Sequence, residues 1–398
     1  MTDPRISRAP RTTAESFVAD GEQHTGPLNG AAGTGNPAPD GPDALGEELR
    51  QKVQRQAERV QQTAAGVQTE AQRRVETVQQ RASKLRTQLE FRREKRDPIR
   101  YRLSISTAKL LARFASVLPG PVRVRLAILI GWIIFRFNSG FRDNVRDNLH
   151  HVLGPDATEE RIDATSRSIA RNGILNILDL LIMYRRGPAE VLALMDLDPA
   201  FVRHLDGKGR EPGGTIVVTA HLGSFDMIGQ AIGVMGCPLT ILTGRTTYRA
   251  LFDAVSFLRS TKGGRIVEPS PSGVRGIYRS LRRGEVVGIV CDRDFFFNGI
   301  PVRFFGAQTT LPPGPVRIAR DTGAMLLPTF ARRNGDRHEI RVQPAFEVPR
   351  TDDVEADVAA GMAFLVAALE REIGAEPEQW SIFQRVWPDL APVTASGS

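Results

Sequence analysis

Residues 215–226, TIVVTAHLGSFD, decide the fold and locate the first candidate for chemistry. The stretch begins with an almost unbroken apolar run, which is typical of a strand buried on both faces of a sheet. His221, Gly223 and Asp226 follow this run directly, and an apolar helical segment comes after them. Residues just past the carboxyl end of such a strand border the crevice in which α/β proteins bind ligands. The stretch therefore predicts a strand, a turn carrying ionisable residues, and a helix.

The rest of the chain after Pro199 continues this alternation. Short apolar runs predict further strands at 239–243, 265–268, 286–291, 324–330 and 338–348. Helical patterns lie between or around them at 159–186, 247–262, 272–283, 314–322 and 353–374. Strands that alternate with helices in this way predict an α/β fold, with a largely parallel central sheet flanked by helices.

The N-terminal quarter differs sharply in composition. Residues 1–43 are rich in Gly, Pro, Thr, Ala and Asp and have almost no large apolar side chains, so we expect a disordered tail. Residues 44–97 are dominated by Gln, Arg, Glu and Ala, with weakly apolar positions three and four residues apart. This spacing predicts a charged helix or coiled coil. A solvated single helix and self-association through 45–94 both remain open.

The predicted main domain at 98–392 begins with an apolar segment at 103–141, whose centre is LAILIGWIIFRF at 126–137. A membrane-spanning helix needs ~20 apolar residues. This run is shorter and is bordered by Arg123, Arg125 and Arg136, so we predict membrane-associating helices that lie in the interface. A single transmembrane helix and a core helix of the globular domain are the alternatives.

The overall composition restricts the class of protein. Among 398 residues, 41% are hydrophobic and 25% are charged, which is too polar for a protein with several membrane spans. The formal net charge of +8 predicts an acidic partner. In the helix at 44–97, glutamates interspersed among the basic residues, without accompanying aromatic residues, argue against nucleic acid. The basic residues that border the apolar segment at 103–141 favour an anionic membrane surface. The N-terminus lacks the apolar core of a secretory signal, and Cys237 and Cys291 lie in apolar stretches, as expected of buried thiols in a reducing cytoplasm.

His221 and Asp226 form the candidate catalytic pair. A carboxylate five positions after a histidine, at a strand-to-helix turn, can fold back to accept the Nδ1 proton of the imidazole. The other ring nitrogen, Nε2, is then available to take a proton from a hydroxyl group. Gly223 permits the tight turn, and the start of a helix favours the negative charge of Asp226. We therefore predict a general base with its orienting carboxylate.

The spacing of His221 and Asp226 resembles the HxxxxD signature of the lysophospholipid acyltransferase superfamily. The chain is especially similar to its branch of lipid A lauroyl/myristoyl acyltransferases and phosphatidylinositol mannoside acyltransferases. The landmarks of that branch occur here in order as SFLRSTKGG with Arg259, GEVVGIVCDRD with Asp292, VRFFG at 302–306, TTLPPGP at 309–315, DTGAMLLPTF at 321–330 and PEQWSIFQRVW at 377–387.

The resemblance implies transfer of a fatty acyl group from acyl-CoA or acyl carrier protein to a hydroxyl of a membrane lipid, without a metal or other cofactor. His221 would be the general base and Asp226 its partner. The resemblance gives Arg259 as the candidate for binding a phosphate or polar headgroup, with an ion pair on a helix surface as the alternative. The other substrate-binding candidates are Asp292 and Arg293 for the acceptor pocket, and Arg245, Arg249 and Arg303 for phosphate contacts, where solvated surface charges are the alternative.

The resemblance also bears on substrate and location. The lipid A branch usually carries Glu at the position of Asp226, whereas the mannoside branch carries Asp. We therefore expect an acceptor like phosphatidylinositol mannoside, with a lipid A precursor or a lysophospholipid as alternatives, and a position at the cytoplasmic face of the plasma (inner) membrane. A non-catalytic membrane adaptor on the same fold is the competing hypothesis, and an intact His and Asp pair argues against it.

Overall fold

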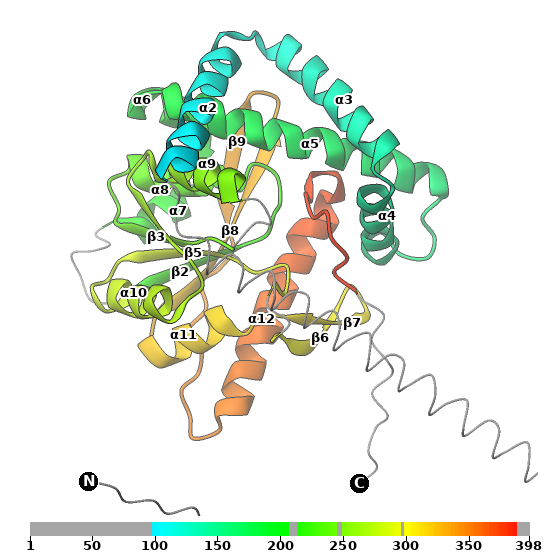
Figure 1. The fold of residues 1–398 in the computed structure, drawn as a ribbon. Helices are drawn as coiled ribbons and strands as arrows, with labels where there is room; N and C mark the ends of the chain where they lie inside the picture. The colour runs from blue at the N-terminus through cyan, green and yellow to red at the C-terminus, as the bar shows by residue number, and fades with distance from the viewer. Residues whose placement is uncertain (1–97, 207–212, 245–248, 296–297, 388–398) are drawn as a thin grey trace, which may run out of the picture. The chain divides into compact units, whose positions relative to one another are not determined.

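The computed structural model describes residues 98–206, 213–244, 249–295 and 298–387 (Figure 1). The predicted tail at 1–43, the predicted helix or coiled coil at 44–97 and Arg245 lie outside these residues. The self-association proposed for 45–94 therefore stays a prediction.

The centre of the fold is a sheet of seven described strands in the order β1-β9-β8-β2-β5-β3-β4. Neighbouring strands are parallel except β8 and β9, which are antiparallel. The predicted α/β fold with a largely parallel sheet is confirmed. The strands are β1 (Met195–Leu197), β2 (Thr215–Thr219), β3 (Leu239–Leu242), β4 (Gly264–Val267), β5 (Val286–Val290), β8 (Met325–Asn334) and β9 (Arg337–Val342).

Two features of the strands were not predicted. The short edge strand β1 contains only three residues, too few for a pattern in the sequence. The second feature is an antiparallel hairpin, β6 (Ile300–Phe304) and β7 (Ala307–Leu311), which forms a separate sheet. The turn of this hairpin contains Phe305 and Gly306, both with positive φ, so the VRFFG landmark is the end of a strand and its turn.

Helices cover both faces of the sheet, as Figure 1 shows. Alternate side chains of β2 point to opposite faces: Ile216 and Val218 belong to one buried cluster and Val217 to another. The first cluster includes side chains of α10 (Pro271–Arg282), α11 (Gly314–Thr322) and α12 (Val354–Ala375). The second includes side chains of α2 (Pro98–Val117), α5 (Glu159–Arg185), α7 (Pro199–Leu205), α8 (Asp226–Val234) and α9 (Arg249–Ser260). The chain therefore builds its core as helix, sheet and helix layers.

The segment predicted to contact a membrane is helical but broken. It contains α2, α3 (Gly120–Phe137) and the beginning of α4 (Ser139–Leu153), and Pro119 separates α2 from α3. No single helix of the described residues has the length and hydropathy needed to cross a membrane. Only α3 and α4 taken together meet those criteria, and they are bent by 97° at their junction.

The helices α2 and α3 bury small side chains and expose large ones. Apart from Ile105, the buried positions have small side chains or none: Ser104, Ala108, Ala112 and Ala115 of α2, and Ala127 and Gly131 of α3. The exposed apolar side chains are Ile99, Leu103, Leu110, Leu111, Phe114, Val117, Val122, Val124, Ile128, Leu129, Trp132, Ile133 and Phe137. Surface helices of globular proteins bury their large apolar residues against the core, so the arrangement in α2 and α3 is the reverse of the usual one.

The close approach of α3 to α5 explains the small residues on its inner side. A Cβ atom at Gly131 would lie 2.9 Å from the backbone nitrogen of Arg171, which is closer than real Cβ contacts allow. The two backbones therefore meet at this point, and α3 turns its bulky side chains away from the domain.

The turn after β2 depends on Gly223. Its φ is +53°, in the left-handed region, and a Cβ atom here would collide with the carbonyl oxygen of Ala331 in β8. Only glycine fits both requirements. The β2 turn is thus pressed against β8, which fixes the path of the chain between His221 and α8.

We predict that Gly223→Ala lowers the free energy of unfolding by about 3 kcal/mol, because the left-handed backbone cost and steric overlap add. Gly236→Ala is the matched control, since Gly236 also has a positive φ of +77° but nothing lies within 4 Å of its Cβ position. It should lose only about 1 kcal/mol. Equal losses for the two variants in chemical denaturation would contradict the predicted contact with Ala331.

Candidate active site

The register of two central strands brings the candidate residues together. In the parallel pair β2 and β5, Thr219 lies opposite Val290. His221 and Asp292 each follow two residues later, so both leave the sheet at the same level of its carboxyl edge. The hydrogen bond from the Cys291 amide to the Thr219 carbonyl, 2.8 Å long, extends the pairing of the strands up to this edge.

His221 and Asp292 make two hydrogen bonds. Nδ1 of His221 lies 2.8 Å from Oδ1 of Asp292, and the His221 backbone amide donates to Oδ2 at 2.8 Å. A carboxylate can only accept, so the ring bond requires the proton on Nδ1 and leaves Nε2 of the neutral imidazole as an acceptor. Among the described residues, no hydrogen bond to Nε2 is formed. The side chain of His221 is 21% exposed, whereas that of Asp292 is fully buried.

The surroundings of Asp292 keep its carboxyl group ionised. Burial acts to raise its pKa, but the charge and side-chain hydrogen bond of His221, the indole N–H of Trp380 and the His221 amide act in the opposite sense. The result is a pKa below the ordinary value for aspartate. The Trp380 indole donates to Oδ2 of Asp292 at 2.8 Å. Asp292 thus remains an anion beside the ring that it orients.

The predicted contact between His221 and Asp226 requires a correction. Both carboxylate oxygens of Asp226 accept from the Arg259 guanidinium, from Nε at 2.6 Å and from an Nη at 3.2 Å. Asp226 begins α8 and turns toward α9, while Asp292 occupies the position at Nδ1 of His221. Proximity in sequence suggested the wrong carboxylate, because strand register brought a distant one closer. A catalytic role for Asp226 stays a prediction.

Two aromatic rings lie close to both His221 and a nearby arginine. The His221 ring meets the Phe225 ring edge to face at 5.1 Å, and Arg259 lies over the same Phe225 ring at 5.7 Å. The His221 ring also lies 6.1 Å from the Phe295 ring, over which Arg293 stacks at 4.4 Å. The predicted residues Arg259 and Arg293 therefore both lie near the histidine, each with one aromatic ring between.

Arg293 is additionally held by the C-terminal segment, residues 376–387, because its guanidinium donates to Oε1 of Gln384. Burial lowers the pKa of Arg293, and the charges of Asp292 and Asp294 oppose that change. A partly desolvated cation next to the histidine is well placed to attract an anionic substrate group.

Other predicted residues lie in different environments. Arg303 in β6 donates from Nε to the Gly306 carbonyl at 3.0 Å and is exposed, so it stabilises the hairpin turn. Arg249 begins α9 and lies 3.8 Å from Asp253, one helical turn on. Arg245 lies outside the described residues.

Metal ligands and cysteine thiols are two other kinds of group that could carry chemistry. Among the described residues, no cluster of three or more His, Cys, Asp or Glu could hold a metal ion. Cys237 and Cys291 are free thiols, and burial raises the pKa of each. Neither thiol is therefore activated as a nucleophile.

The sequence profile described as "Bacterial lipid A biosynthesis acyltransferase" matches residues 89–388, which include all seven strands of the central sheet and the His221 site. The chain belongs to this family.

Curated relatives carry two kinds of name. A phosphatidylinositol mannoside acyltransferase of Mycobacterium tuberculosis (strain CDC 1551 / Oshkosh) is 28% identical over 254 residues, which are 62% of this chain and 78% of that protein. Its namesake from Mycolicibacterium smegmatis is 27% identical over 63% of this chain and 80% of its own length. A lipid A biosynthesis acyltransferase of Haemophilus influenzae is 23% identical over 45% of this chain and 55% of its own length.

The lowered pKa of Asp292 predicts a pH dependence of stability. A carboxyl group whose pKa is lower in the folded state stabilises that state above its unfolded pKa, about 3.9, and the contribution disappears as the pH falls through the folded value. The difference in unfolding free energy between the wild type and Asp292→Asn should therefore be constant near pH 6 and change below pH ~4 in favour of the variant. Urea denaturation of both proteins across this range tests it. A pH-independent difference would contradict the assignment.

Proposed function

We propose that the chain transfers a fatty acyl group from a thioester to a hydroxyl of a membrane glycolipid like phosphatidylinositol mannoside. The observation that carries the proposal is the hydrogen bond between Nδ1 of His221 and the buried Asp292 carboxylate. It directs the acceptor nitrogen Nε2 away from Asp292, on a side chain that is still partly exposed. Membership of an acyltransferase family supplies the reaction class.

The chemistry follows from the state of the histidine. Nε2 of His221 accepts the proton of the acceptor hydroxyl as its oxygen attacks the thioester carbonyl carbon. The imidazolium formed in this step is stabilised by the Asp292 carboxylate at 2.8 Å. The tetrahedral intermediate then collapses, the carbon–sulfur bond breaks, and the proton on Nε2 passes to the departing thiolate. An ester and a free thiol result, and the enzyme returns to its starting state.

Within this mechanism, Asp226 acts through Arg259. Their bidentate ion pair links the start of α8 to the end of α9, and both side chains are largely buried, at 14% and 16% exposed. Arg259 in turn packs over Phe225, which contacts the histidine ring. Asp226 thus fixes the guanidinium next to the reaction site, where Arg259 and Arg293 are proposed to bind the anionic groups of donor or acceptor.

Two observations favour a mannoside acceptor over a lipid A precursor. The mannoside acyltransferases align with a larger share of this chain than the Haemophilus influenzae protein does, at higher identity. Asp226 also matches the residue that the mannoside branch carries. The acyl donor proposed is acyl-CoA or acyl carrier protein.

The exposed apolar side of α2 and α3 is proposed to rest in the interface of an anionic membrane. Its large side chains, such as Leu129 and Trp132, are exposed, and Trp132 has the amphipathic ring typical of the headgroup boundary. Exposed basic residues accompany them, namely Arg100, Arg102, Lys109, Arg113, Arg125 and Arg136. Apolar insertion together with cationic flanks favours anionic lipid.

We predict that His221→Ala lowers kcat for acyl transfer by at least ~10²-fold, since the general base is lost, and that Asp292→Asn does the same because the imidazolium loses its counter-charge. The assay follows a radiolabelled acyl group from acyl-CoA to phosphatidylinositol mannoside, with lysophospholipid and a lipid A precursor as other acceptors. His150→Ala is the control, because His150 is 51% exposed on α4 and lies outside the site. Full turnover by His221→Ala would refute the mechanism, and transfer only to another acceptor would refute the substrate.

The same acyl-transfer assay tests whether Asp226 and Arg259 act together. If Asp226 acts through Arg259, then Asp226→Asn and Arg259→Gln cause losses that do not add, and the double variant is little worse than Arg259→Gln alone. Additive losses would instead favour independent roles, as a direct His221 to Asp226 contact would require.

We predict that Ile128→Glu with Trp132→Glu lowers the partition coefficient for anionic vesicles at least ~10-fold, because two apolar groups no longer enter the interface. Vesicle sedimentation with phosphatidylinositol or with neutral phosphatidylcholine measures this change. Val354→Glu is the matched control, since Val354 is a similarly exposed apolar residue, at 52%, on α12. Unchanged partition of the double variant would contradict the membrane assignment, and conversion of an oligomer to a monomer would indicate a second copy as the occupant.

A further inference from the structure

We propose that Trp380 is a positioning residue of the acyl-transfer site, whose indole N–H holds the Asp292 carboxylate in the orientation that aligns His221. The effect of Trp380 on catalysis rests on the proposed function. The effect of the Trp380 indole on the Asp292 carboxylate does not depend on that function.

Asp292 needs such a holder because only one of its oxygens faces the imidazole. Oδ1 lies at Nδ1 of His221, while Oδ2 accepts from the His221 amide and from the Trp380 indole. With both donors on Oδ2, rotation of the carboxylate about its Cβ–Cγ bond breaks hydrogen bonds that water cannot replace, since Asp292 is fully buried. Without the indole, Oδ2 keeps a single donor and the carboxylate can turn away from the ring.

The indole is itself fixed by its aromatic neighbours. Trp380 is 1% exposed and meets the ring of Phe304 at 6.5 Å and that of Trp387 at 6.2 Å, both edge to face. Phe304 and Trp387 stack on each other at 5.4 Å. Packing in this cluster restricts the orientation of the Trp380 ring and therefore the direction of its N–H.

Main-chain bonds on both sides of Trp380 join it to the turn after β2. The Ser381 amide donates to the His221 carbonyl at 2.7 Å, and the Gly223 amide donates to the Gln379 carbonyl at 2.9 Å. Leu222 and Trp380 thereby form an isolated antiparallel bridge. The backbone of the histidine turn and the indole that holds Asp292 consequently move as one unit.

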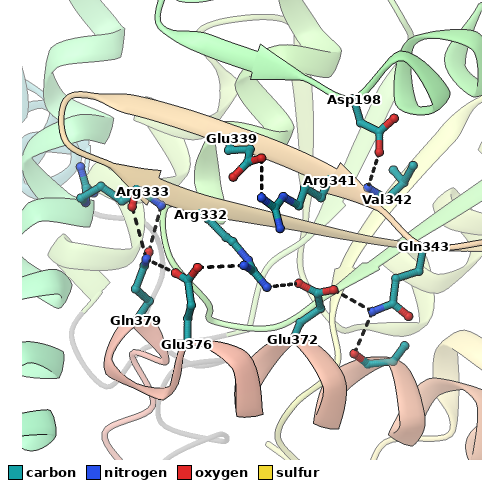
Figure 2. A network of polar contacts seen from close by, with 11 residues as sticks. Asp198, Arg332, Arg333, Glu339, Arg341, Val342, Gln343, Glu372, Glu376 and Gln379 are labelled. Carbon is teal, nitrogen blue, oxygen red and sulfur yellow. Dashed lines mark hydrogen bonds and ion pairs between the residues drawn. The ribbon is translucent and has the colours of Figure 1, made fainter.

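A polar network fixes the start of this C-terminal segment, as Figure 2 shows. Oε1 of Gln379 accepts from the Arg333 amide at 2.9 Å, and Nε2 of Gln379 donates to the Arg333 carbonyl at 3.3 Å. Arg332 bridges Glu376 and Glu372 at 2.8 and 2.9 Å. The end of α12 is thus tied to β8, one of the two strands that flank β2.

Loss of the indole N–H has two expected effects. One hydrogen bond that lowers the pKa of Asp292 disappears, so that pKa rises toward the ordinary value. The carboxylate also gains freedom to rotate, so His221 spends less time with Nε2 directed at the acceptor. The first effect is visible without turnover, and the second lowers kcat without weakening substrate binding.

The test compares Trp380→Phe with Trp387→Phe in the full chain. The two substitutions remove the same atoms from the same aromatic cluster, and each deletes one buried indole hydrogen bond. The bond lost in the control runs from Trp387 to the Phe304 carbonyl at 3.1 Å and does not involve Asp292. The two variants therefore share the packing loss and differ in the donor to Oδ2.

The first measurement is acyl transfer. We expect Trp380→Phe to lower kcat about 10- to 100-fold with KM within about twofold, the loss that one hydrogen bond to a charged group brings. Trp387→Phe keeps an aromatic ring against Trp380, so the indole N–H stays directed at Asp292, and kcat should stay within about threefold at a comparable loss of thermal stability. Equal kcat losses in the two variants would overturn the proposal and make Trp380 a packing residue only.

The second measurement is the titration of the Asp292 carboxyl carbon by ¹³C NMR, assigned by its absence in Asp292→Asn. The pKa of Asp292 should rise by about one unit in Trp380→Phe and stay unchanged in Trp387→Phe. An unchanged pKa in Trp380→Phe would overturn the proposal. If the wild type shows no acyl transfer, the proposed function fails, and this titration still decides whether the indole controls Asp292.

Discussion

A buried carboxylate keeps its charge only where hydrogen-bond donors surround it, and the described residues give Asp292 three: the ring and the amide of His221 and the indole of Trp380. These donors come from parts of the chain that are far apart in sequence. The bond to His221 spans 71 residues and the bond to Trp380 spans 88. The central sheet and the C-terminal segment must therefore both be in place before the carboxylate is satisfied.

The sequence allowed the architecture to be predicted but not the partner of the histidine. Unbroken apolar runs such as 215–220 and 286–291 identified β2 and β5, because strands buried on both faces have no polar alternation to obscure them. The partner of His221 depends on which strand lies beside β2. Strand order is set by packing of the whole domain, so the contact of Thr219 with Val290 could not be seen in either stretch alone. The sequence alone indicates the nearer Asp226 as the partner, and it shows Trp380 only as part of the stretch PEQWSIFQRVW at 377–387.

In the apolar segment at 103–141, the sequence indicates where the helices lie but not which side of each helix faces the domain. Packing decides that, and at Gly131 the backbones of α3 and α5 meet so closely that only a residue without a side chain fits. Large residues such as Trp132 and Phe137 are consequently directed outward. The interfacial placement and the core-helix alternative thus share the same sequence pattern and differ only in contacts made 40 residues later in the chain, at Arg171.

The C-terminal segment also determines when the site can exist. Asn144 and Asn148 in α4 donate to the carbonyls of Phe383 and Gln384, 239 and 236 residues further along, and Asn172 in α5 donates to that of Glu378. During synthesis the helices α2 to α5 leave the ribosome well before Trp380 and the carbonyl groups to which these asparagines donate. Contacts of such long range form late and slowly. The helices α2 and α3 are thus complete before Asp292 has its full set of donors, so the proposed membrane contact can form before the proposed general base is assembled.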